Sequence, residues 1–163
     1  MDEIMTAAEA MEASAMPCAR VVHCDDGTAP TPEQLPLPAA LAKKPVGDKG
    51  QAEWAYERLV LYLKNFEDQL DKNHEIAMGF AGGTAGVLRI EGVGYFNPDI
   101  VTFYGADEAG TKMQLIQHVT QLNVVLRAVT KATPEAEPPR RIGFRLVQDL
   151  DEAAKITTAD ASK

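Results

Sequence analysis

Hydrophobic and polar positions follow two different periods along this chain, and the longest periodic stretch runs from Thr111 to Lys131. Its apolar residues recur three or four positions apart, as they do along one face of an amphipathic helix: Leu115, Val119, Leu122, Leu126 and Val129. Thr111 can cap the first turn, and the proline-containing run 132–139 ends the pattern. We therefore predict one long helix over residues 111–131.

A second helical pattern begins after Asp48, which has the spacing of a capping box with Gln51. The segment QAEWAYERLVLYLKNFEDQLDK that follows is predicted to be a helix. Its expected core-facing residues are Ala55, Leu59, either Tyr62 or Leu63, Phe66 and Leu70. Its expected solvated residues are Glu53, Glu57, Lys64 and Asp68.

Four other segments alternate with the period of two that is typical of strands. They are HEIAMGFA (74–81), AGVLRIEGVGYF (85–96), IVTFYGAD (100–107) and RRIGFRLV (140–147). Gly82 and Gly83 are expected to form a hairpin turn, Gly92 and Gly94 indicate a bulge or a tight coil of the strand, and turns are expected at 97–99 and 107–110. In the last segment Ile142, Phe144 and Leu146 are expected to point to one side.

These elements predict a two-layer α+β domain over residues 48–150, because a meander joined by short turns is antiparallel and two helices can cover one of its faces. The expected order is a helix, a three-stranded antiparallel meander, the long helix and a fourth strand. Residues 1–47 are expected to be disordered, with a short amphipathic helix over 1–16 as an alternative. Residues 151–163 are expected to form a polar tail.

Charge and hydropathy narrow the classes of function. The net charge is −8 and the pI is near 4.9, which argues against nucleic-acid and anionic-membrane binding because both need clustered Lys and Arg. Acidic residues also outnumber basic ones within the predicted domain, so we rank nucleic-acid binding last among the candidate functions. Membrane-length apolar runs are absent from the sequence, and its first residues are acidic, so we expect a cytoplasmic protein.

The sequence gives little indication of a metal site, a cofactor site or a strong catalytic motif. Cys18, His23, Cys24 and Asp25 could ligate zinc, but a structural zinc site needs a second pair of ligands, and we expect no metal and reduced thiols. The glycines of GFAGGTAG are predicted to form a hairpin, not a phosphate loop, because they lead into a strand. We expect no cofactor and assign no catalytic residue.

A group of arginine, tyrosine and glutamate side chains is the main candidate binding site. If the helices cover one face of the sheet, the period of two turns these residues to the other face: Arg89, Glu91, Tyr95, Tyr104, Arg141 and Arg145. Arginines beside tyrosine rings can hold anionic or flat ligands. The sequence therefore favours a non-enzymatic binding or adaptor module for a protein or an anionic small molecule, and a homodimer is compatible with this. The plainer alternative is a solvated face on which Arg89 and Glu91 pair.

His118, with Gln117 beside it, is the alternative site. A histidine near a carboxylate such as Glu91 or Asp107 can act as a base, which would make the chain a small hydrolase or transferase. The competing interpretation is a partly exposed structural histidine.

The core also resembles a known family. The segments WAYERLVLYLKNFEDQL, HEIAMGFAGG, IEGVGYFNPDIVTFYG, LIQHVTQLNVVLRAV and PPRRIGFRL are similar to those of a small bacterial family described only as a domain of unknown function. The resemblance covers the chain from Trp54 to Leu146 and implies no activity, cofactor or catalytic residue.

Overall fold

The structure, a computed structural model, describes residues 19–44, 46–80 and 86–160. The chain divides into two compact units, residues 1–36 and 37–163. In the first unit, the 3-10 turn η1 (Pro32–Gln34) follows Thr31, whose backbone amide donates to Gln34 Oε1 at 3.0 Å. The helix predicted over residues 1–16 lies outside the described residues, and the domain boundary at Asp48 stays a prediction.

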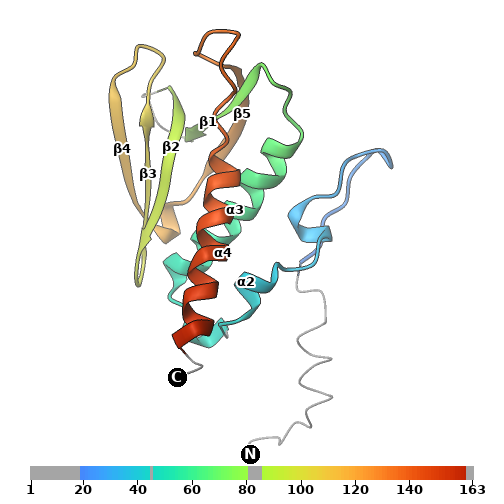
Figure 1. The fold of residues 1–163 in the computed structure, drawn as a ribbon, viewed down its shortest axis with the longest axis vertical. Coiled ribbons are helices and arrows are strands. Elements are labelled where there is room, and N and C mark those ends of the chain that lie inside the picture. Colours follow the sequence, from blue (N-terminus) through green and yellow to red (C-terminus); the bar gives the residue numbers. More distant parts are fainter. Residues whose placement is uncertain (1–18, 45, 81–85, 161–163) are drawn as a thin grey trace, which may run out of the picture. The chain divides into compact units, whose positions relative to one another are not determined.

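The second unit is an α+β fold, as predicted. A five-stranded antiparallel sheet lies between two long helices in the sequence. The elements before the sheet are α2 (Ala39–Ala42), the 3-10 turn η2 (Val46–Asp48) and α3 (Gln51–Asp68), and the helix after it is α4 (Ile142–Asp160). In Figure 1, α3 and α4 run next to each other on one side of the sheet.

The strands are β1 (His74–Phe80), β2 (Val87–Phe96), β3 (Ile100–Ala106), β4 (Lys112–His118) and β5 (Val124–Thr130). Their order across the sheet is β4-β3-β2-β1-β5, with every neighbouring pair antiparallel (Figure 1). The predicted meander of the first three strands is confirmed, as is the bulge, which lies between Ile90 and Gly92. The hairpin turn predicted at Gly82 and Gly83 lies outside the described residues.

The long helix predicted over residues 111–131 is wrong. This stretch contains β4, a 3-10 turn η3 (Val119–Gln121) and β5. It is rich in β-branched residues, which pack well on a pleated surface and lose side-chain freedom in a helix. Leu115 and Leu126 still face the core, but as members of two alternating strands and not of one helical stripe.

The strand predicted over residues 140–147 is also wrong, because this segment begins α4. Ile142, Leu146 and Leu150 lie four residues apart and pack against the core, whereas Phe144 is exposed. The run that follows, predicted as a short turn and a tail, continues the helix to Asp160. The fold therefore has a helix, five strands and a helix, where the sequence predicted a fourth strand at the end.

The core lies between the sheet and the two long helices. Its largest fully buried side chains come from α3, β1 and β3: Val60, Leu63, Met78, Val101 and Phe103. The sequence predicted that either Tyr62 or Leu63 faces the core. In the structure Leu63 faces the core and Tyr62 is exposed. Both layers of the domain are thus held by one contiguous apolar cluster.

The N-terminus of α4 is held by α3. Glu67 is buried, and its two carboxylate oxygens accept the backbone amides of Gly143 and Phe144, each at 3.0 Å. These amides have no partner within the helix, and a carboxylate suits the positive end of a helix dipole. A Cβ on Gly143 would lie 2.8 Å from Lys64 Cα, so glycine permits this close approach of the two helices.

The start of α3 is fixed by tertiary contacts and not by the predicted capping box. Gly50 is the N-cap residue and makes no side-chain bond, while the backbone amide of Ala52 donates to Pro98 O at 2.9 Å. Glu57, expected in solvent, is buried and accepts a 2.7 Å hydrogen bond from Lys49 Nζ. The side chains of Lys49 and Glu57 are only 3% and 8% exposed.

The buried ring of Tyr56 predicts a pH dependence of stability. Burial, helped by the charge of Asp149, raises the pKa of Tyr56 from 10.0 to about 12. Its ring lies 5.0 Å from that of Tyr95. Between pH 10 and about pH 12 the unfolded tyrosine ionises while the folded one stays neutral, so stability is lost as the pH rises.

We expect the melting temperature of Tyr56→Phe to fall less steeply over this alkaline range than that of the wild type. The exposed Tyr104 provides the matched control, since Tyr104→Phe should leave the wild-type slope unchanged. Thermal melts followed by circular dichroism check both. Equal slopes for Tyr56→Phe and the wild type would contradict the prediction.

Candidate functional site

Among the described residues, α3 and α4 cover one face of the sheet, and the other face, which we call the open face, is exposed over β2, β3 and β4. The strand register places open-face residues of β2, β3 and β4 in four rows across these strands. From one end to the other the rows are Phe96–Ile100–His118, Gly94–Thr102–Ile116, Gly92–Tyr104–Gln114 and Arg89–Ala106–Lys112. The last row continues through Ala77 of β1 to Arg127 of β5.

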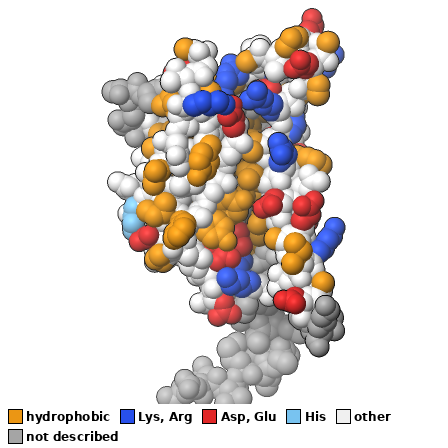
Figure 2. Space-filling view, turned by 60° about the vertical axis from the view of Figure 1, so that its left-hand side comes forward, with side chains coloured by type: hydrophobic (Ala, Val, Ile, Leu, Met, Phe, Trp, Pro, Cys, Tyr) orange, Lys and Arg blue, Asp and Glu red, His pale blue; other side chains and the backbone are white. Residues whose placement is uncertain are grey.

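The first three rows form the apolar end of the open face. Three large hydrophobic side chains from three neighbouring strands are exposed there: Phe96 is 75% exposed, Ile116 61% and Tyr104 44%. We call these three residues the apolar patch. Figure 2 shows hydrophobic side chains gathered in the middle of the molecule, with Lys and Arg side chains along the upper edge. A cluster of this kind on a folded surface is typical of an interaction site.

The ring of Tyr104 lies over Gly92, its partner on β2, and extends towards Gly94 in the next row. A Cβ on Gly92 would lie 3.5 Å from Tyr104 Cδ2, and one on Gly94 would lie 3.9 Å from Tyr104 Cε2. The tyrosine ring therefore lies over β2, in space that larger residues would fill. A ring fixed in this way loses little freedom on binding, which favours its use as a contact.

The fourth row forms the basic end of the open face, with Arg89, Lys112 and Arg127. Arg89 Nη1 donates to Thr130 O at 3.1 Å and lies 4.0 Å from Glu75 Oε2, so its side chain crosses β1. Lys112 Nζ lies 2.7 Å from Glu91 Oε2.

Arg140, in the loop before α4, completes this basic end. Its Nη1 atom lies 3.3 Å from Glu91 Oε1. The hydrogen bond from Lys112, together with the charge of Arg140, lowers the pKa of the Glu91 carboxyl group. Three cations contact two carboxylates here and Arg127 lies in the same row, on a chain whose net charge is −8. These residues are Arg89, Lys112, Arg127, Arg140, Glu75 and Glu91.

Of the six predicted site residues, the structure brings Arg89, Glu91 and Tyr104 together on the open face. The other three lie elsewhere. Tyr95 pairs with Val101 on the covered face, because the bulge shifts the alternation by one residue. Arg141 donates to the carbonyl oxygens of His74 and Asp71 at 2.9 Å and 2.8 Å, and so fixes the turn before β1. Arg145 lies on α4 and is exposed.

His118 has a carboxylate partner, but it is Asp99 and not Glu91 or Asp107. His118 Nε2 lies 3.2 Å from Asp99 Oδ2. Its Nδ1 atom accepts the backbone amide of Thr120 at 3.2 Å and lies 2.7 Å from Thr120 Oγ1. His118 therefore caps η3 through Nδ1 and contacts a carboxylate through Nε2.

Gln117, the neighbour of His118, points to the covered face opposite Val101. Its Oε1 atom is buried and has no hydrogen-bond partner among the described residues. The two residues of the alternative site therefore lie on opposite faces of β4 and do not form one site.

Groups of three or more His, Cys, Asp or Glu side chains placed to hold a metal ion are absent from residues 19–44, 46–80 and 86–160. Cys18, one of the predicted zinc ligands, lies outside these ranges, and Cys24 is an exposed free thiol. Within the same part of the chain, the helices are too short or too polar to cross a membrane.

Sequence comparison agrees with the predicted resemblance to a family of unknown function. The model of DUF6173, described as a family of unknown function, matches residues 46–145, which include α3, the whole sheet and the start of α4. Neither a curated protein nor a solved structure matches the chain. The match therefore gives a family without an activity.

Proposed function

We propose that this chain, which belongs to the family of unknown function DUF6173, is a protein-binding module that uses the open face of its sheet. The observation that carries the proposal is the apolar patch, in which Phe96, Tyr104 and Ile116 stand exposed on adjacent strands. Exposed aromatic and aliphatic side chains of this size are characteristic of the centres of protein interfaces.

The basic end of the open face indicates the chemistry of the partner. Cations outnumber carboxylates there, so an acidic segment is attracted and a basic one repelled. The apolar patch lies next to the basic end, in the first three rows of the same strands. The partner we propose is a protein segment that carries hydrophobic side chains followed by acidic ones.

A small anionic ligand is a weaker fit to the same surface. Arg89 and Lys112 already contact carboxylates of the chain, and Arg140 shares Glu91 with Lys112. A small anion would have to compete with these pairs without help from the apolar patch. A protein segment gains from both ends of the open face.

We expect Ile116→Glu to weaken binding of acidic, hydrophobic peptides at least about tenfold, because it places a negative charge within the apolar patch. The probes are synthetic peptides that combine Leu and Phe with Asp and Glu, selected on an array and titrated by calorimetry. Ile156→Glu provides the matched control, since Ile156 is also largely exposed but lies on α4. Its affinity should equal that of the wild type.

The salt dependence offers a second readout of the same experiment. Affinity for the acidic peptides should fall as the salt concentration rises, because the basic end is exposed to screening. Arrays that select basic peptides, or equal affinities for wild type and Ile116→Glu, would contradict the proposal.

A further inference from the structure

The bulge of β2 gives Glu91 a special position at the basic end of the open face. The residues before and after Glu91 pair with Gly105 and Tyr104 of β3, so Glu91 itself is the extra residue and has no partner on that strand. A bulge can redirect a side chain in this way. The carboxylate of Glu91 reaches across β3 to Lys112 of β4.

Both oxygens of the Glu91 carboxylate have a cationic partner. Lys112 Nζ donates to Oε2 at 2.7 Å and to Oε1 at 3.0 Å, and Arg140 Nη1 donates to Oε1 at 3.3 Å. The hydrogen bond from Lys112 lowers the pKa of Glu91, so this carboxyl group is held in its charged form. Lys112 and Arg140, which come from distant parts of the sequence, thus form a site for one carboxylate, and Glu91 occupies it.

These side chains are exposed enough for a partner to replace the contacts. Lys112 is 76% exposed, Arg140 62% and Glu91 30%. Ion pairs between exposed side chains contribute little to stability, because water solvates the separated charges well. The other carboxylate at the basic end, Glu75, is different: it is buried and accepts the backbone amide of Arg140 at 2.8 Å. Glu75 therefore fixes the loop, while Glu91 can leave its two cations.

We propose that Glu91 is an intramolecular competitor, which occupies the site formed by Lys112 and Arg140 until an acidic side chain of the partner displaces it. This inference rests on the proposed function and identifies the contact made by the acidic part of the bound segment. Because the exchange replaces one carboxylate by another, negative charge alone contributes little net binding. A segment must also contact the apolar patch, so Glu91 selects against ligands that are only acidic.

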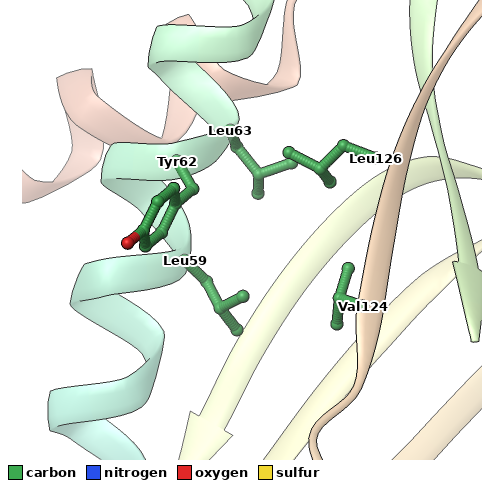
Figure 3. A pocket seen from close by; sticks show the side chains of 5 residues that line it. All are labelled: Leu59, Tyr62, Leu63, Val124 and Leu126. Carbon is green, nitrogen blue, oxygen red and sulfur yellow. The ribbon is translucent and has the colours of Figure 1, made fainter. Parts of the chain in front are cut away.

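The groove between α3 and β5 does not offer a second site of this kind. Figure 3 shows side chains of α3 facing side chains of β5 across it: Leu59, Tyr62, Leu63, Val124 and Leu126. None of these five residues is charged. The groove therefore has no group that would attract a carboxylate, and a change at Glu91 reports on the basic end of the open face.

Glu91→Gln should raise the affinity for the acidic, hydrophobic peptides at least about fivefold, because the amide keeps the shape of the side chain but loses the competing charge. Calorimetry measures the change. The matched control is Glu108→Gln, which removes one negative charge from the exposed turn between β3 and β4, close to the same row. It should raise the affinity less than about twofold, since only the general charge of the domain changes.

The double variant Lys112→Met, Glu91→Gln tests whether the gain passes through the proposed site. In the Lys112→Met background, Glu91→Gln should have a clearly smaller effect than in the wild type, because one of the two cations is already absent. Equal gains for Glu91→Gln and Glu108→Gln would show a general effect of net charge and would overturn the inference. A lower affinity of Glu91→Gln would also overturn it, because Glu91 would then position the two cations for the partner.

Hexaglutamate separates this inference from the proposed function, because it carries carboxylates and no hydrophobic side chain. In an NMR titration at low salt, Glu91→Gln should bind hexaglutamate at least about fivefold more tightly than the wild type, with shifts at the amides of residues 112 and 140. Equal binding, or none to Glu91→Gln, would overturn the role of Glu91 while the apolar patch could still bind peptides. If the peptides fail to bind but hexaglutamate distinguishes the variants, the proposed function is wrong and the competition by Glu91 stands.

Discussion

Replacing Lys49 with methionine is expected to lower the free energy of unfolding by about 3–5 kcal/mol, because it leaves the Glu57 carboxylate buried without a counter-charge. Lys49 Nζ donates to Glu57 Oε2 and to Leu41 O, each at 2.7 Å. Methionine fills a similar volume, so the loss comes from the charge and the hydrogen bonds and not from a cavity. Urea unfolding followed by circular dichroism measures the change.

Two controls make this result specific. Lys44→Met removes a similar pair, Lys44–Glu53, in which the lysine side chain is 48% exposed, and should cost at most about 1 kcal/mol. The double variant Lys49→Met, Glu57→Leu should recover most of the loss, because neither buried charge remains. If Lys49→Met unfolded at the same urea concentration as Lys44→Met, the pair would not be buried as described.

Replacing Glu67 with alanine is expected to lower the free energy of unfolding by about 2–4 kcal/mol. The change leaves the amides of Gly143 and Phe144 without acceptors where the helices meet, and each such loss costs about 1–3 kcal/mol. It also removes a negative charge from the positive end of α4. Urea unfolding measures the change here too.

Asp68→Ala is the natural control for Glu67→Ala, because Asp68 is the next residue of α3 but is exposed and pairs with Lys64. Asp68→Ala should lower the free energy of unfolding by about 0.5 kcal/mol. Glu67→Gln, which keeps one acceptor oxygen, should fall between the two. Equal costs for Glu67→Ala and Asp68→Ala would show that α4 does not depend on this cap.

The parts of the fold that sequence analysis predicted are those with one clear period. α3 carries a helical pattern over five turns, and β1 to β3 alternate between marked turns. Residues 111–131 fit both a helical period and a strand period, because Leu115 and Leu126 face the core in either arrangement. The density of β-branched residues favours the two strands, and a reading of the period alone does not include it.

The start of α4 was missed because its helical signals are not local. Its cap is Glu67, which lies far away in the sequence, and Gly143, which suggests a strand or a turn, is present because α4 approaches Lys64 closely. No pattern within residues 140–147 contains that information. A helix whose cap comes from another element can be identified only once the two elements are seen together.

The candidate site was predicted in part for a similar reason. Gly92 and Gly94 indicated the bulge, but the predicted alternation did not allow for it. That alternation puts Tyr95 on the open face and Phe96 on the covered face, whereas in the structure Tyr95 is on the covered face and Phe96 on the open face. One extra residue reverses every later side chain of a strand. Restarting the alternation at the bulge places Phe96 on the same face as Tyr104, whereas the position of Ile116 depends on recognising β4.

The sheet order also determines how this domain is built during synthesis. The pairings from β1 to β4 join strands that follow one another, so they can form as soon as each hairpin leaves the ribosome. β5 must instead return to β1, past three strands already in place. Until it does, β1 is itself an open edge of the nascent sheet, and α4 has not yet been made to cover the other half of the core. The last quarter of the chain, residues 124–160, therefore pairs the free edge of β1 and covers the rest of the core.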